Sequence, residues 1–204
     1  MIADPGSPAT DPRVWSALFA FFAVGVAYVT ARLSVKNKQI DFLLYDHKQY
    51  DELQKKRLEI RIEEARLGTL PTVSEWEKKR LALEVDMFFD RFWSLQFDGY
   101  VAWYDGYVPT SLYTFWLFAR WREMYDPSPE WTLDKTTVPA SLEIVSERWS
   151  LNPDPRSRET HQLDKFVRLM TDLGTERNVN IDELLKQYGP SPIRRVLRKF
   201  LGAY

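Results

Sequence analysis

The stretch Val14–Ala31 reads VWSALFAFFAVGVAYVTA, 18 residues without a charge. As a helix rising about 1.5 Å per residue it would extend roughly 27 Å, close to the thickness of the hydrocarbon core of a bilayer. Trp15 and Tyr28 stand near its two ends, where aromatic side chains favour the membrane–water interface. The composition therefore predicts a transmembrane helix over residues 14–33, preceded by a short tail, 1–13.

Two other interpretations fit an apolar run at this place in the chain. A buried core helix of such length and composition is unusual in so small a domain. A cleaved signal peptide is suggested by residues 29–31, which have the small side chains of a cleavage site. However, the tail before the run carries Asp4 and Asp11 against Arg13, so it lacks the positive charge typical of a signal peptide. We therefore expect a retained anchor.

Basic residues flank the predicted anchor unequally. Only Arg13 precedes it, whereas Arg32, Lys36 and Lys38 follow it directly. Because basic residues favour the cytoplasmic side, this asymmetry predicts that the tail lies outside and that the bulk of the chain is cytoplasmic. The layout resembles that of bacterial proteins in which one membrane helix precedes a small helical domain. This likeness of architecture implies a bacterial inner membrane.

Small residues recur along one face of the predicted anchor. In lipid they let a second helix approach closely, and this packing drives association between helices. The alternative is that alanine is simply common in such helices. The predicted face, which would meet an integral membrane partner or a second copy of the chain, consists of Ser16, Ala20, Ala23, Ala27 and Ala31.

The next segment, 34–68, is predicted to continue the anchor as a helical stalk. It contains good helix formers and no proline or glycine before Gly68. Leu53, Ile60 and Leu67 recur every seven residues, but Arg57 interrupts the parallel line of apolar residues. The pattern therefore does not support a sustained coiled coil.

Residues 69–204 are predicted to form a small multi-helix cytoplasmic domain. Ser74 and Glu77 have the spacing of a capping box and begin a helix. A third helix is expected over Thr110–Tyr125, and its run Phe115–Phe118 is apolar nearly all round, which fits either a central helix or one exposed to a partner. The buried stripe expected on the capped helix consists of Leu81, Val85, Phe88, Phe89, Phe92 and Leu95.

The remainder of the domain alternates loops with short helices. A long loop is expected over Asp126–Pro139, followed by helices over Ala140–Trp149, Ser157–Gly174, 181–188 and 191–201. No segment shows the alternation of a strand, so the predicted fold class is all-α.

The helix 191–201 combines an apolar stripe with basic residues. One interpretation places it on an anionic membrane surface, where each basic residue contributes about 1 kcal/mol. The alternative is that its stripe packs on the domain while the basic face is solvated. The predicted lipid contacts are Arg194, Arg195, Arg198 and Lys199.

A tandem repeat is the most distinctive local motif. Phe97–Val101 reads FDGYV, and Tyr104–Val108 reads YDGYV. Either both lie in one helix with their Asp-Gly pairs on one face, or the second pair forms a helix C-terminus before Pro109. A structural role is favoured; the functional alternative is cation or basic-partner binding by Asp98 and Asp105 with Asp90, which no calcium-loop spacing supports.

Composition argues against several classes of function. The net charge of -1 is untypical of nucleic-acid binders, and the absence of cysteine excludes disulfides and thiol chemistry. The two histidines, His47 and His161, are distant in sequence, and no catalytic or phosphate-binding motif is present. No cofactor and no metal are expected.

Aromatic residues are unusually frequent, at 15% of the chain, and such residues favour interfaces. The sequence therefore predicts a non-catalytic, single-pass membrane-anchored subunit or adaptor. The alternative is a membrane-tethered regulator or effector with an unrecognised enzymatic or sensing site. A deep polar pocket would favour the regulator, and a flat aromatic patch would favour the adaptor.

Overall fold

The computed structural model describes residues 12–125, 129–150, 158–175 and 178–191, together with 193 and 196. These residues contain helices and no strand, apart from one isolated bridge between Leu133 and Thr136, so the expected all-α class is confirmed for them. The elements are α1 (Pro12–Gly68), α2 (Glu75–Asp105), α3 (Thr110–Tyr125), the 3-10 turn η2 (Pro129–Trp131), α4 (Val138–Ser150), α5 (Arg158–Thr175) and α6 (Ile181–Tyr188).

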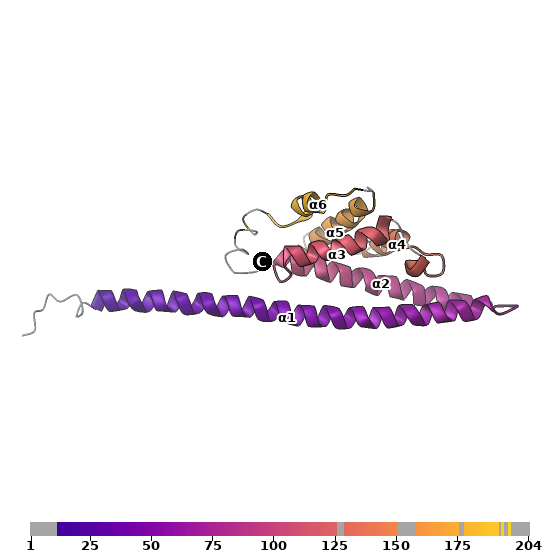
Figure 1. The fold of residues 1–204 in the computed structure, drawn as a ribbon, viewed down its shortest axis with the longest axis horizontal. Helices are drawn as coiled ribbons and strands as arrows, with labels where there is room; N and C mark the ends of the chain where they lie inside the picture. Colours follow the sequence, from indigo (N-terminus) through magenta and orange to yellow (C-terminus); the bar gives the residue numbers. More distant parts are fainter. Residues whose placement is uncertain are drawn as a thin grey trace, which may run out of the picture.

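Helix α1 is a single rod of 57 residues, and the other helices gather over its C-terminal half (Figure 1). Its N-terminal half contains the apolar stretch, and none of the residues in that apolar window is buried. The helix is thus long and apolar enough near its N-terminus to cross a membrane, and this part of it is not a core helix of the chain.

The C-terminal half of α1 forms a helical hairpin with α2. Leu53, Ile60 and Leu67, the residues at seven-residue spacing, are the buried residues of α1. This spacing keeps one narrow line of apolar side chains on the side of a straight helix that faces its neighbour. Residues 34–68 are helical, as expected for a stalk, but their distal part also belongs to the hydrophobic core of the domain.

Helix α2 begins and ends at the positions that the sequence indicates. The Ser74 hydroxyl accepts a hydrogen bond from the Glu77 amide at 3.2 Å, and the Glu77 carboxylate accepts one from the Ser74 amide at 3.2 Å. Gly106 ends the helix with a φ of 89°, a left-handed conformation that glycine adopts without strain. The first Asp-Gly pair therefore extends α2 and the second forms its C-terminus. All six residues of the predicted stripe are buried.

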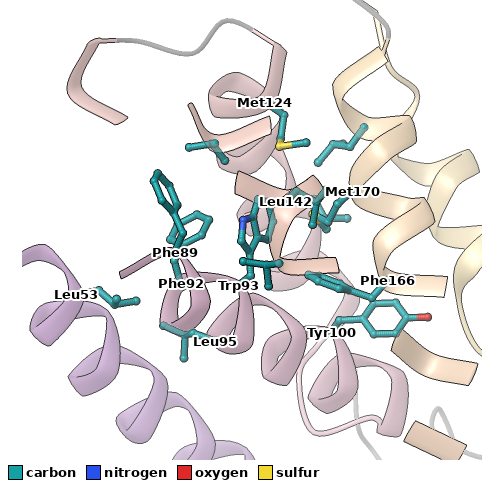
Figure 2. Close-up of a cluster of buried hydrophobic side chains, with 14 of the residues drawn as sticks. Leu53, Phe89, Phe92, Trp93, Leu95, Tyr100, Met124, Leu142, Phe166 and Met170 are labelled. Atoms are coloured by element: carbon teal, nitrogen blue, oxygen red, sulfur yellow. The ribbon is translucent and has the colours of Figure 1, made fainter. Parts of the chain in front are cut away.

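The core is built around the aromatic residues of α2 (Figure 2). Trp93 is fully buried, contacts Phe92 edge-on at 5.0 Å between ring centroids, and lies 6.3 Å from Phe166 of α5. Its indole nitrogen donates a hydrogen bond to the Ser141 hydroxyl of α4 at 2.9 Å. These rings join α2 to α4 and α5, so burial in this core accounts for part of the high aromatic content.

The expected bounds of α4 and α5 differ from the structure by one or two residues. The expected loop before α4 contains η2, and α4 begins at Val138 rather than Ala140. Pro139 lies in the first turn, where its missing amide hydrogen costs no hydrogen bond, so it does not delay the helix. Of the predicted helix 191–201, Ile193 and Val196 are helical and exposed, and the remainder other than Ser191 lies outside the described residues.

Candidate functional site

The small-residue face of the predicted anchor lies entirely on the free half of α1. Ser16, Ala20, Ala23, Ala27 and Ala31 are all exposed, and the domain leaves this part of the helix uncovered. Association of this face with a second helix stays a prediction. The predicted lipid contacts Arg194, Arg195, Arg198 and Lys199 lie outside the described residues.

The three aspartates considered as a cation site are not gathered together. Asp90 is paired with Arg148 of α4 at 2.8 Å, an interaction that ties α2 to α4. Asp98 is exposed in the middle of the C-terminal part of α2, and Asp105 is its last residue. Among the described residues no group of three or more His, Cys, Asp or Glu side chains is arranged to hold a metal ion.

A cleft of about 420 Å³ lies between α1, α2 and α3, with Met170 of α5 also in its lining. Its walls are mainly apolar and aromatic, and they carry three ionisable side chains. An apolar cleft of this size with a few polar groups is the usual form of a small-molecule site. The lining includes Tyr50, Tyr113, Phe115 and Trp116 among the aromatic residues and Asp46, His47 and Arg120 among the ionisable ones.

Asp46 is the half-buried carboxylate of this cleft. Burial, reinforced by the nearby carboxylate of Asp98, raises the pKa of Asp46 to about 6, although His47 and Arg120 act to lower it. Burial also raises the pKa of Asp98. Within the described part of the chain no cationic side chain lies within ion-pair distance of the Asp46 carboxylate. The cleft thus contains a carboxylate that the fold desolvates and does not neutralise.

Arg120 lines the same cleft and is itself buried. Its guanidinium makes two contacts of 2.9 Å with the Glu123 carboxylate, and it lies 5.0 Å above the centre of the Phe92 ring. Burial raises the pKa of Glu123 to about 7, against the lowering effect of Arg120. The positive charge of Arg120 is therefore already matched inside the protein, in a geometry typical of arginine and carboxylate.

Tyr113 is a buried lining residue whose hydroxyl has no hydrogen-bond partner among the described residues. Its ring stacks on Trp103 with centroids 4.8 Å apart, which fixes the side chain. A buried hydroxyl normally finds a partner, so an unpaired one beside a cleft is consistent with a partner supplied from outside the chain.

Helix α3 also presents an exposed aromatic ridge, Phe115 and Phe118, on the side away from buried Leu117. One side of the apolar run 115–118 packs inward through Leu117, and the other side is exposed; contact of this exposed side with a partner stays a prediction. Phe118 and Trp121 line a second, shallower hollow against residues 178–182. The ridge lies between two concave surfaces, an arrangement suited to a protein partner.

Catalytic chemistry receives no support from the arrangement of side chains. His47 is exposed and lies 3.6 Å from Asp51, while His161 is on a different helix, α5. No serine or threonine is among the lining residues of the main cleft. The geometry provides binding surfaces of two kinds, an aromatic ridge and a cleft with one unneutralised carboxylate.

Sequence reasoning missed the residues of this cleft. Asp46 belongs to a segment with mixed charges, which is typical of a solvated helix face, and only the tertiary packing of the domain gives it a desolvated environment. Arg120 did provide a signal, because it directly follows the apolar run 115–119 and Glu123 stands three residues later, a spacing that places the two charges on one side of a helix. No family model, curated protein or solved structure matches the chain.

Proposed function

We propose that the protein is a single-pass membrane-anchored, non-catalytic subunit or adaptor. The observation that carries this proposal is the contrast within α1, whose apolar window has none of its residues buried although it continues without a break into the folded domain. Exposing so many large apolar side chains to water would be costly, whereas a bilayer would solvate them.

In this proposal the domain sits directly on the bilayer. Lys38 follows Leu33 by five residues, or about 7.5 Å of helix, and this distance is close to the thickness of one headgroup layer. The Lys38 ammonium lies 5.4 Å from the centre of the Tyr107 ring, at the C-terminal end of the hairpin partner α2. Folded structure would therefore begin at the level of the headgroups, without a long free stalk.

The end of α6 lies at this same end of the domain. The Tyr100 hydroxyl donates a hydrogen bond to the Tyr188 carbonyl at 2.8 Å, and Gly189 is so close to Trp103 that an added Cβ would come within 2.7 Å of the indole. The basic segment 191–201 follows directly. This position supports lipid contact through Arg194, Arg195, Arg198 and Lys199, with the exposed side chains of Ile193 and Val196 in the same segment.

Two surfaces support a role in docking on a membrane protein complex. The small-residue face of α1 would associate with another helix inside the bilayer. The aromatic ridge Phe115 and Phe118 would contact the cytoplasmic part of the same partner, because exposed aromatic side chains are enriched in protein interfaces. The cytoplasmic position of the domain follows from the basic residues Arg32, Lys36 and Lys38.

The test combines topology with association. We expect the full chain to stay in membranes after alkaline washing, and a C-terminal reporter that is active only after export to remain inactive. Purification in a mild detergent should then recover a stoichiometric membrane protein that is lost when Phe115 and Phe118 are both changed to Ser. Release by alkaline washing would contradict the anchor, an active reporter would contradict the orientation, and a solitary chain would contradict the adaptor.

A second candidate function, a membrane-tethered regulator with a sensing site, is favoured by one observation. The cleft between α1, α2 and α3 has the volume and the mainly apolar lining of a small-molecule site. Ligand binding there would bridge α1 and α3, since Asp46 of α1 and Trp116 of α3 both line the cleft.

A further inference from the structure

The charge balance of the cleft favours one kind of ligand. The charge of Arg120 is matched by Glu123 at 2.9 Å, and exposed His47 lies beside Asp51. Asp46 is left as the lining charge without an ion-pair partner among the described residues, and Asp98 adds a second carboxylate nearby. A positive group at this position would gain attraction from both carboxylates, whereas an anion would be repelled.

The walls of the cleft fit the same kind of ligand. Tyr50 comes from α1, and Tyr113, Phe115 and Trp116 come from α3. Aromatic faces attract ammonium groups through their negative π surface, and combinations of such faces with a carboxylate recognise quaternary ammonium compounds. The ring of Tyr113 belongs to this lining, and its buried hydroxyl has no hydrogen-bond partner among the described residues.

We propose that the cleft between α1, α2 and α3 binds a small organic cation. This ligand has an aromatic or short alkyl body, which lies against the aromatic walls, and one ammonium group, which lies at the carboxylate of Asp46. This assignment rests on the sensing function proposed above and does not depend on the membrane anchor. Binding would neutralise a carboxylate that the fold desolvates, which is where an added cation gains most.

The test uses benzyltrimethylammonium as the probe, because its charge is independent of pH. Benzyl alcohol serves as a neutral probe of similar shape and phenylacetate as an anionic one. Calorimetric titration of the full chain in uncharged maltoside micelles at pH 7.5 should give binding of the cation about tenfold tighter than that of benzyl alcohol, with no binding of phenylacetate. Equal affinity for the cation and benzyl alcohol would overturn the ligand class while leaving the cleft as a site, and no binding of any probe would overturn both.

Substitutions of Asp46 test whether the cation binds at this carboxylate. Asp46→Asn should weaken binding of the cation about tenfold and leave that of benzyl alcohol unchanged, and Asp46→Glu should retain most of the affinity. The matched control is Asp41→Asn, which removes an exposed carboxylate from the same helix, five residues away and outside the cleft. Circular dichroism verifies that each variant keeps its helices. Equal losses in Asp46→Asn and Asp41→Asn would overturn the site, since they would reveal only general attraction to a negative surface.

The pH dependence gives an independent readout. The groups that act on Asp46 are Asp98 from α2, His47 from α1 and Arg120 from α3. Because protonation removes the charge of Asp46, affinity for the cation should fall several-fold between pH 7 and pH 5, and Asp46→Asn should lose most of this dependence. A pH profile that is unchanged in Asp46→Asn would overturn the role of this carboxylate.

Discussion

The two halves of α1 belong to one helix but differ in burial, since the N-terminal half is exposed and the C-terminal half packs on the domain. The N-terminal half is the more apolar, yet Phe21 is 80% exposed and no residue of the apolar window is buried. The C-terminal half is rich in Lys, Arg and Glu, yet Leu53 is 2% exposed and Ile60 is fully buried. Average hydropathy would have placed the core in the wrong half of this helix.

The difference shows that spacing, rather than composition, selects the half that packs on the protein. In the C-terminal half the buried apolar residues recur every seven positions and form one line, while charged residues and exposed apolar residues such as Ile62 lie on the other sides. Around the N-terminal half large apolar residues occur on most sides, so a single neighbouring helix would leave many of them in water. Such a surface is suited to the hydrocarbon core of a bilayer, which surrounds a helix with apolar groups on all sides.

The largest expected effect is a difference in the free energy of unfolding between substitutions of two isoleucines in the packed half. Ile60→Ala should lower the free energy of unfolding by about 2–5 kcal/mol, because it removes fully buried methyl groups and leaves a cavity between α1 and α2. Ile62→Ala is the matched control, since Ile62 is 61% exposed, and its effect should stay within about 0.5 kcal/mol. Chemical unfolding of the full chain in detergent gives both values. Equal effects would contradict the hairpin of α1 and α2.

A charge in the free half should affect insertion without affecting folding. Val24→Arg places a charge near the middle of the predicted span and should cost about 3 kcal/mol of insertion free energy. The expected result is a shift of the chain from the membrane fraction to the soluble fraction, with an unchanged melting temperature of the helical domain. Val24→Leu is the control and should leave both quantities unchanged. A lowered melting temperature of the domain in Val24→Arg would show that this half packs on the protein.

Of the two halves of α1, the packed half should contribute to the dependence of stability on pH, in addition to Asp98 of α2 and Glu123 of α3, whose pKa values are also raised. The pKa of Asp46 in the folded chain, about 6, lies above its ordinary value of 3.8, so the folded state binds more protons between these values. The free energy of unfolding should therefore fall as the pH rises from about 4 to 7, and Asp46→Asn should reduce this fall. Allowing for solvent screening, the contribution of Asp46 is about 1 kcal/mol. Asp41→Asn should leave the slope of stability against pH unchanged, and a parallel change in both variants would exclude burial of Asp46 as the cause.

The smallest expected effect concerns the small-residue face of the free half. Ala23→Leu combined with Ala27→Leu should weaken association of the helix with its membrane partner roughly three- to tenfold, because leucine blocks close approach but remains compatible with lipid. Val26→Leu combined with Val29→Leu adds bulk off the small-residue face and should leave association unchanged. Recovery of the complex in mild detergent measures both. Similar recovery for the two pairs would shift the interaction to the cytoplasmic domain.

The helices could largely be predicted from the sequence because their signals are local. The capping box Ser74–Glu77 and the stripe on α2 each depend on residues close in sequence, and both predictions are confirmed. For the tandem Asp-Gly pairs the sequence left two arrangements open, and the structure has the one in which Gly106 ends the helix. The start of α4 was missed because proline tolerates the first turn of a helix as well as a loop. Its position depends on Thr137, whose carbonyl accepts a hydrogen bond from the Ser141 amide at 2.9 Å.

The sequence by itself determined that the chain is helical, where its helices lie, and that one apolar stretch is long enough to cross a membrane. Only the tertiary structure decided that the distal half of the predicted stalk belongs to the domain and that Asp46 of α1 and Trp116 of α3 line one cleft. The physical reason is the distance in sequence over which each interaction acts. Helix periodicity and capping arise from neighbours in sequence, whereas burial of a carboxylate and the pairing of Arg120 depend on which helices pack side by side, and such packing joins residues far apart in the chain.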